Sequence, residues 1–237
     1  MPPEIALPAA LGAALDAGAA ALGLSPDATQ RAALLRLLAE LAEWNTRFNL
    51  TAIREPREMV PKHLLDSLSV QPWLAGDRIA DVGTGAGFPG LPLAIMNPGR
   101  HFALIESTGK KARFVEHAAR SVGLSNVEVV NARAEAWRPG KPFDTVVCRA
   151  VGKVAEIVRV AGHLCAPDGR LLAMKGQHPA EELAGLPRGW RVQGIHPVTV
   201  PGLGAARHVV ELQRGDSTVS PPRAAAPGTG SRRTKGR

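Results

Sequence analysis

Hydrophobic and polar positions change their spacing along this chain near residue 76. Before that point, apolar side chains recur at helical spacing, at Leu34, Leu37, Leu38, Leu41 and Trp44. This period predicts a helix that starts around Ser25-Pro26-Asp27 and ends near Asn49. An Ala- and Leu-rich stretch over 8–24 predicts a preceding helix, and residues 55–74 predict one or two shorter ones. We therefore expect residues 1–76 to form a helical cap.

From Arg78 onward, short apolar runs alternate with helix-like segments. The predicted strands are 78–82, 102–106, 126–130, 143–148, 169–175, 190–198 and 206–213. The predicted helices between them are 89–97, 108–122, 153–165 and 179–185. Such alternation is typical of a mostly parallel sheet with helices on both faces, and the last two strands, which have no helix between them, predict an antiparallel edge pair. Residues 77–214 are thus expected to form one α/β domain with a seven-stranded, Rossmann-like sheet.

A glycine-rich loop follows the first predicted strand. The strand ends at Asp81, and three glycines follow at alternate positions, Gly83, Gly85 and Gly87. Glycines at this spacing permit a sharp turn and a close approach of a ligand to the backbone. The alternative is that they only make a tight turn.

The ligand of this loop can be predicted in two ways. Gly85, Gly87 and Gly90 satisfy the Gly-x-Gly-x-x-Gly pattern of dinucleotide sites. A pyrophosphate, however, needs free backbone N–H groups, and Pro89 offers none. The Asp81 carboxylate suits a sulfonium ligand with an ammonium group better than a diphosphate. We therefore favour S-adenosylmethionine over NAD.

Charged residues end the next strands in the predicted order. Glu106 lies 19 positions past Gly87, near the spacing of about 20 at which a carboxylate binds ribose hydroxyls, in NAD or in S-adenosylmethionine. Arg133, Arg149 and Lys175 follow or end the third, fourth and fifth predicted strands. If the sheet forms as expected, they line its carboxyl edge as a cationic rim suited to phosphates. Each alone is equally explained as a surface charge.

Composition narrows the class of protein. The chain has 237 residues, 45% of them hydrophobic, and a formal net charge of +8. Residues 215–237 contain five basic groups and one acid, so we expect a disordered basic tail. Cys148 and Cys165 lack metal-ligand spacing, which predicts reduced thiols and no metal site. Without an apolar run of membrane-spanning length, we expect a cytoplasmic monomer that does not enter a membrane.

In their order and spacing, these segments resemble the 16S ribosomal RNA (guanine-N7) methyltransferase family, also called glucose-inhibited division protein B. The resemblance extends from about Trp44 to Gln213. Its segments are Trp44-Asn45, Phe48-Asn49-Leu50-Thr51, His63-Leu-Leu-Asp66-Ser67, Asp81 to Gly90, Glu106-Ser107, Lys110-Lys111, Phe114, Arg133-Ala-Glu135, Arg149-Ala150, Lys175-Gly176 and Arg207-His208. Lys111 and Cys148 depart from the family, where arginine and serine are frequent.

The resemblance implies S-adenosylmethionine as methyl donor and a guanine in the decoding-site loop of 16S rRNA as acceptor. It implies that the cofactor site is lined by Gly83, Phe88, Ala134, Glu135 and Arg149. Guanine N7 carries a free lone pair, which agrees with the absence of a clear general base in the sequence. Two alternatives stay open: an rRNA-binding or assembly factor without catalysis, and an NAD-dependent reductase, which the chain's lack of tyrosine disfavours.

Overall fold

The computed structural model describes residues 9–215. Its helices are α1 (Ala9–Ala21), α2 (Ala28–Phe48), α3 (Pro56–Met59), a π-helix (Val60–Leu65), α4 (Asp66–Leu68), a 3₁₀-helix (Gln71–Trp73), α5 (Gly90–Met96), α6 (Gly109–Ser121), α7 (Val154–Ala161), a second 3₁₀-helix (Gly162–Leu164) and α8 (Ala180–Leu183). Its strands are β1 (Arg78–Val82), β2 (His101–Ile105), β3 (Val127–Val130), β4 (Phe143–Arg149), β5 (Cys165–Lys175), β6 (Trp190–Val198) and β7 (Arg207–Arg214).

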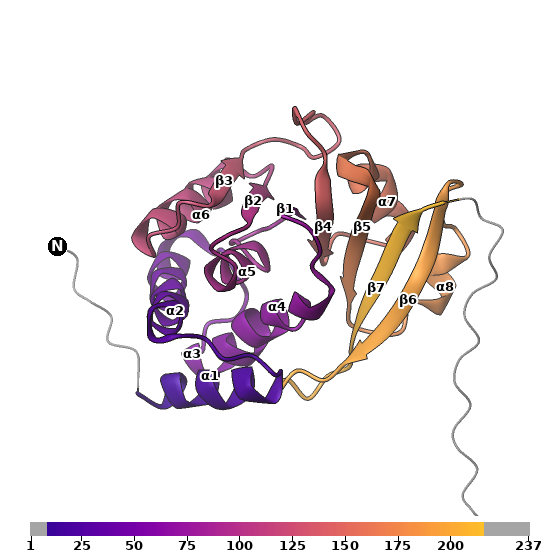
Figure 1. Cartoon of the computed structure of the whole chain (residues 1–237). Helices are drawn as coiled ribbons and strands as arrows, with labels where there is room; N and C mark the ends of the chain where they lie inside the picture. The colour runs from indigo at the N-terminus through magenta and orange to yellow at the C-terminus, as the bar shows by residue number, and fades with distance from the viewer. Residues whose placement is uncertain (1–8, 216–237) are drawn as a thin grey trace, which may run out of the picture.

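The strands form a single sheet in the order β3-β2-β1-β4-β5-β7-β6 (Figure 1). The first five pair in parallel, whereas β7 pairs antiparallel with β5 and β6. The predicted α/β class and antiparallel edge pair are confirmed. Because Val82 is level with Ile105 and Cys148, the carboxyl ends of β1, β2 and β4 meet at one edge. The start of β7 joins this edge, since His208 pairs with Lys175 at the end of β5.

Two apolar cores cover the two faces of the sheet, because successive side chains of a strand point to opposite faces. Ile79, Phe102 and Leu104 belong to the core shared with α1, α2, α5 and α6. Ala80 and Ala103 belong to the other core, with α7. Both faces are therefore buried, as a parallel sheet requires.

The helices that precede β1 occupy residues 9–73 of the structure. Asp27 caps α2: its carboxylate accepts the Gln30 N–H at 2.8 Å, and the Gln30 side chain accepts the Asp27 N–H in return. The helix thus begins directly after Asp27, which agrees with the predicted start around Ser25-Pro26-Asp27. Its end is confirmed, because Asn49 adopts a left-handed conformation with φ of 48°. The boundary of the helical cap at residue 76 stays a prediction.

Other boundaries differ slightly from prediction. β5 begins at Cys165 and not at 169, although Pro167-Asp168-Gly169 has turn composition. Residues 55–74 form four short segments, and one of them is the π-helix. The predicted tail over 215–237 lies, beyond its first residue, outside the described residues. Among the described helices, none combines the length and apolar character that crossing a membrane requires.

Candidate active site at the carboxyl edge of the sheet

The glycine loop connects β1 to α5 and is held together by Asp81. The Asp81 side chain is fully buried, and its Oδ2 accepts the Thr84 hydroxyl at 2.5 Å and the Gly90 N–H at 2.7 Å. Burial raises the pKa of this carboxyl from 3.8 to about 6, although the two hydrogen bonds oppose the rise. Its other oxygen, Oδ1, has no partner within residues 9–215. Asp81 therefore shapes the loop and keeps one acceptor free.

Glu106 binds the same loop from the end of β2. Its Oε2 accepts the Gly85 N–H at 2.9 Å and its Oε1 accepts the Thr108 N–H at 2.7 Å. The carboxylate is 6% exposed. Sequence reasoning expected this group to be free for ribose hydroxyls, and the structure adds a role in fixing the loop. Each carboxylate oxygen can accept a second bond, so the ribose contact stays a prediction.

The loop fits an S-adenosylmethionine ligand on two structural observations. A Cβ built on Gly85 meets no atom within 4 Å, so the backbone is open to a ligand there. The unpartnered Asp81 Oδ1 can accept from an ammonium group. The sulfonium ligand would supply an electrophilic methyl group at this edge.

The turn after β3 belongs to the same edge. The Asn131 side-chain amide donates to the Glu106 carbonyl at 2.8 Å and so ties this turn to the end of β2. Ala134 is buried, whereas Glu135 and Arg133 are exposed. The predicted cofactor contacts of Ala134 and Glu135 are thus placed beside the Glu106 segment, and their roles stay predictions.

Arg149, at the end of β4, is fixed by the helical segment before the sheet. Its Nη1 donates to Asp66 Oδ2 at 3.0 Å and to the Lys62 carbonyl at 3.2 Å. The guanidinium carbon lies 5.8 Å from the centre of the Phe88 ring. The predicted pair of cofactor-site residues, Phe88 and Arg149, is therefore brought together.

Asp66 also binds Arg207, the first residue of β7. Arg207 Nε donates to Asp66 Oδ1 at 2.7 Å, and the Asp66 side chain is 5% exposed. Sequence reasoning assigned neither residue a role, because Asp66 lies 83 positions from Arg149 and 141 from Arg207. One signal in the sequence was available: Asp66 lies between the apolar residues Leu65 and Leu68. A carboxylate buried among such residues requires polar or charged partners.

The predicted cationic rim is only partly free. Lys175 Nζ bonds Glu182 Oε2 and the Gly152 carbonyl, each at 2.8 Å, and the side chain is 16% exposed. Arg133 is exposed and, among the described residues, has no carboxylate partner. A phosphate contact by Lys175 would therefore compete with Glu182, whereas Arg133 is available.

His63 covers Phe88 from the π-helix. The two rings stack with centroids 4.8 Å apart, and His63 Nε2 lies 3.1 Å from the Thr51 hydroxyl. Burial and the nearby Arg149 lower the pKa of His63 from 6.5 to about 4. His63 is therefore neutral at pH 7 and covers the Phe88 ring with an uncharged imidazole.

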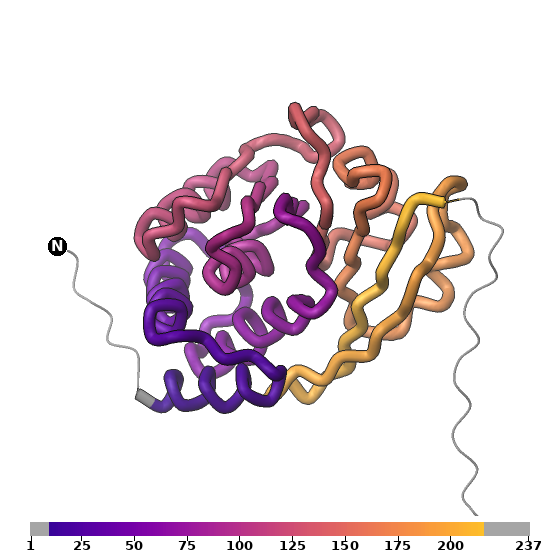
Figure 2. The backbone as a smooth tube through the Cα atoms, viewed as in Figure 1, coloured from indigo at the N-terminus to yellow at the C-terminus, as the bar shows by residue number. Residues whose placement is uncertain are grey.

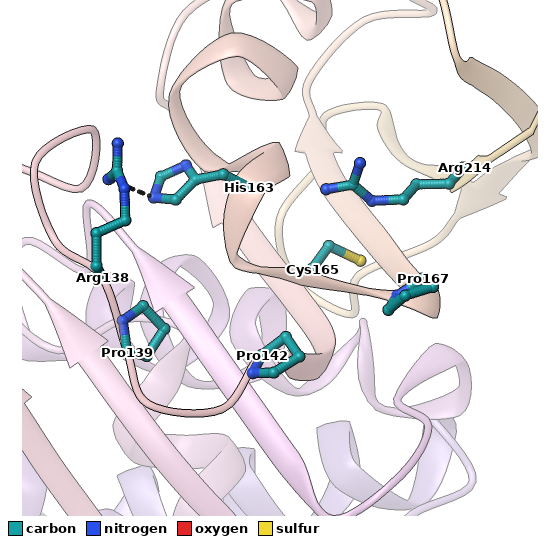
Figure 3. Close-up of a pocket in the computed structure, with 7 residues that line it drawn as sticks. All are labelled: Arg138, Pro139, Pro142, His163, Cys165, Pro167 and Arg214. Carbon is teal, nitrogen blue, oxygen red and sulfur yellow. Dashed lines mark hydrogen bonds between the residues drawn. The ribbon is translucent and has the colours of Figure 1, made fainter.

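A separate pocket lies at the opposite edge of the sheet (Figure 3). It has a volume of about 570 Å³ and is lined by Arg138, Pro139, Pro142, His163, Cys165, Pro167 and Arg214. These residues flank the starts of β4 and β5. None of the predicted site residues lines this pocket, so the candidate active site is the glycine-loop edge. Within residues 9–215, no three His, Cys, Asp or Glu side chains are grouped to hold a metal ion.

Solved structures identify the fold class of this chain. TrmN from Thermus thermophilus superimposes with a TM-score of 0.54 at 23% identity, covering 72% of this chain and 53% of that one. TYW2 from M. jannaschii in complex with AdoMet gives 0.50 at 14% identity, covering 65% and 77%. The fold shared with these two structures is the Rossmann-like α/β fold, in which the glycine loop follows the first strand of the sheet.

Sequence comparison identifies the family. The profile of the GidB family, rRNA small subunit methyltransferase G, matches residues 30–210. The ribosomal RNA small subunit methyltransferase G of Stenotrophomonas maltophilia is 52% identical over 209 residues, which cover 88% of this chain and 98% of that relative. That of Xanthomonas axonopodis pv. citri is 50% identical over 212 residues, 90% and 99%. The chain belongs to the rRNA small subunit methyltransferase G family, as the resemblance predicted. Neither a reductase nor a non-catalytic factor is supported.

Proposed function

We propose that this enzyme transfers the methyl group of S-adenosylmethionine to N7 of a guanine in the decoding-site loop of 16S rRNA. One observation carries the choice of N7. The carboxylates at the cofactor edge, Asp66, Asp81 and Glu106, are all buried and hydrogen-bonded. These three hold the glycine loop and Arg149 in place, and none of the three is exposed to take a proton from a bound nucleophile. A nucleophile with a free lone pair needs no such proton transfer.

Catalysis in this proposal rests on alignment. Gly85 and Glu106 would hold the ribose end of the cofactor, and Asp81 Oδ1 would accept from its ammonium group. Arg149, held by Asp66 beside Phe88, would lie between the cofactor loop and the guanine and orient the base. Methyl transfer moves the positive charge from the sulfur to the methylated guanine, so no proton has to leave. Holding N7, methyl and sulfur in line supplies rate without proton transfer. The guanine must leave its stack to enter the site.

The test is methylation of small ribosomal subunits from a strain that lacks this enzyme, with labelled S-adenosylmethionine. Borohydride and aniline cleavage then maps 7-methylguanine in the rRNA. We expect one modified guanine, in the decoding-site loop, and no label with Arg149→Ala. Label on an exocyclic amine or on a carbon atom would overturn the choice of N7. Protein-free 16S rRNA, tested in parallel, distinguishes naked RNA from the assembled subunit as substrate.

A further inference from the structure

Phe48, the last residue of α2, is an apolar side chain in an unusual position. It is 42% exposed, the only large hydrophobic side chain of the described residues to be exposed to this degree. Single exposed apolar residues are common and need no explanation by themselves. The surroundings of Phe48, however, distinguish it from such a residue.

The Phe48 ring is mounted rigidly. Trp44 packs against it with ring centroids 5.2 Å apart, and Trp44 is in turn held by Phe114 at 5.5 Å and by the His117 ring at 4.8 Å. The helix stops immediately after Phe48, because Asn49 turns the backbone into the left-handed region. One side of the ring is therefore supported by the protein while the remainder faces solvent.

Three cations lie next to Phe48 in the chain or contact Phe48 and Asn49, and none has a carboxylate partner among the described residues. Arg47, Arg54 and Lys110 are exposed, and within residues 9–215 none of them forms an ion pair. Lys110 Nζ instead donates to the Phe48 carbonyl at 3.2 Å, and Arg54 donates to the Asn49 side chain at 3.0 Å. We call Arg47, Phe48, Arg54 and Lys110 the Phe48 patch.

The Phe48 patch lies on the same edge of the sheet as the candidate active site. Lys110 is in the first turn of α6, four residues after Glu106, whose carboxylate binds the glycine loop. The end of α2 meets the start of α6, as the two helices run side by side (Figure 2). An RNA segment that places its guanine beside Arg149 and continues along this edge past Glu106 therefore reaches this patch.

We propose that Phe48 is a stacking platform for an unpaired base of the rRNA substrate, with Arg47, Arg54 and Lys110 holding the adjoining phosphates. An exposed aromatic face with surrounding cations is what a single-stranded RNA segment requires, because bases stack on aromatic rings and the backbone is anionic. The inference rests on the proposed function, since it assigns a second contact to the same substrate. A protein partner is the competing occupant, and unpaired cations favour RNA over it.

The test compares Phe48→Leu, which keeps apolar packing on Trp44 and removes the aromatic face, with Phe48→Trp, which restores one. Phe48→Leu should weaken binding of protein-free 16S rRNA and lower kcat/KM on small subunits, each by about tenfold. Phe48→Trp should restore both, and neither variant should change the Kd for S-adenosylmethionine. Lys110→Ala should lower the salt dependence of rRNA binding by about one phosphate contact, whereas Phe48→Leu should leave it unchanged.

Three results would overturn the inference: wild-type behaviour of Phe48→Leu, an equal loss in Phe48→Trp, or a loss with small subunits but not with protein-free rRNA, which would indicate a protein partner. The proposed function is tested by the wild-type enzyme in the same assay. If that enzyme modifies no guanine of 16S rRNA, both proposals fail. If it does so and Phe48→Leu matches it, only the stacking platform fails.

Discussion

Replacing Gly85 with alanine tests whether the glycine loop is a ligand site or only a turn. Gly85 has φ of 62°, a left-handed conformation that costs an alanine about 1–2 kcal/mol. The new Cβ would meet no protein atom within 4 Å, so no clash adds to that cost. We therefore expect Gly85→Ala to fold, with a free energy of unfolding lowered by about that amount.

The effect on cofactor binding should be larger than the effect on folding. In the proposed complex the cofactor occupies the space that the Cβ would enter. Inserting a methyl group into a fitted contact costs about 1–3 kcal/mol. Because 1.4 kcal/mol is a factor of ten, the Kd for S-adenosylmethionine should rise by about 5-fold to about 140-fold.

Gly123 provides a matched control. It lies after the far end of α6, has φ of 76°, and also offers an added Cβ open space. Gly123→Ala should lose similar stability in urea unfolding and keep the wild-type Kd in titration calorimetry. If Gly85→Ala binds S-adenosylmethionine as tightly as Gly123→Ala does, the loop is only a turn and the site is misplaced.

Four other changes test the electrostatics of the protein. Burial holds the Asp81 pKa at about 6, above 3.8, so this carboxyl favours the folded state below pH 4 and loses that advantage as the pH rises through 6. The free energy of unfolding of wild type, relative to that of Asp81→Asn, should therefore fall by about 3 kcal/mol between pH 4 and pH 7, because the pKa is raised by about two units. Urea unfolding of both proteins across this pH range measures the difference, and a difference that does not change with pH would contradict the prediction. Arg149→Ala should lose methyl transfer in single-turnover assays and keep most of its rRNA binding. Lys175→Ala should weaken rRNA binding and leave the Kd for S-adenosylmethionine unchanged. Wild-type values for both variants would show that Arg149 and Lys175 are ordinary surface charges. Truncation after Arg214 should weaken rRNA binding at low salt without changing the methylated base, and a newly modified base would refute a nonspecific role of the tail.

The arrangement of the sheet and its glycine loop could be predicted because these features are local in sequence. Strand and helix periods alternate from Arg78 onward, and Asp81 and Glu106 end consecutive strands. The π-helix could not be predicted in the same way, because residues 60–65 have an ordinary helical composition. The π-helix nevertheless contributes to the site, because the carbonyl of its residue Lys62 accepts a hydrogen bond from Arg149.

The partners of the charged site residues were beyond sequence reasoning for a different reason. A charge at a strand end is visible in the sequence, but its counter-ion is not. Lys175 was expected to face phosphates and instead bonds Glu182 of α8. Arg149 meets Asp66 across 83 positions. Such pairs depend on how separate elements pack, which the period of a single element does not specify.

The Asp66 bridge has a consequence for the order in which the enzyme becomes active during its synthesis. Asp66 is translated first, Arg149 later, and Arg207 in the final strand of the sheet. A ribosome-bound chain that has not yet released β7 can already contain the glycine loop, but its buried carboxylate has one arginine partner in place of two. The bridge that holds Arg149 in place is therefore complete only when the final strand has been made and has joined the sheet.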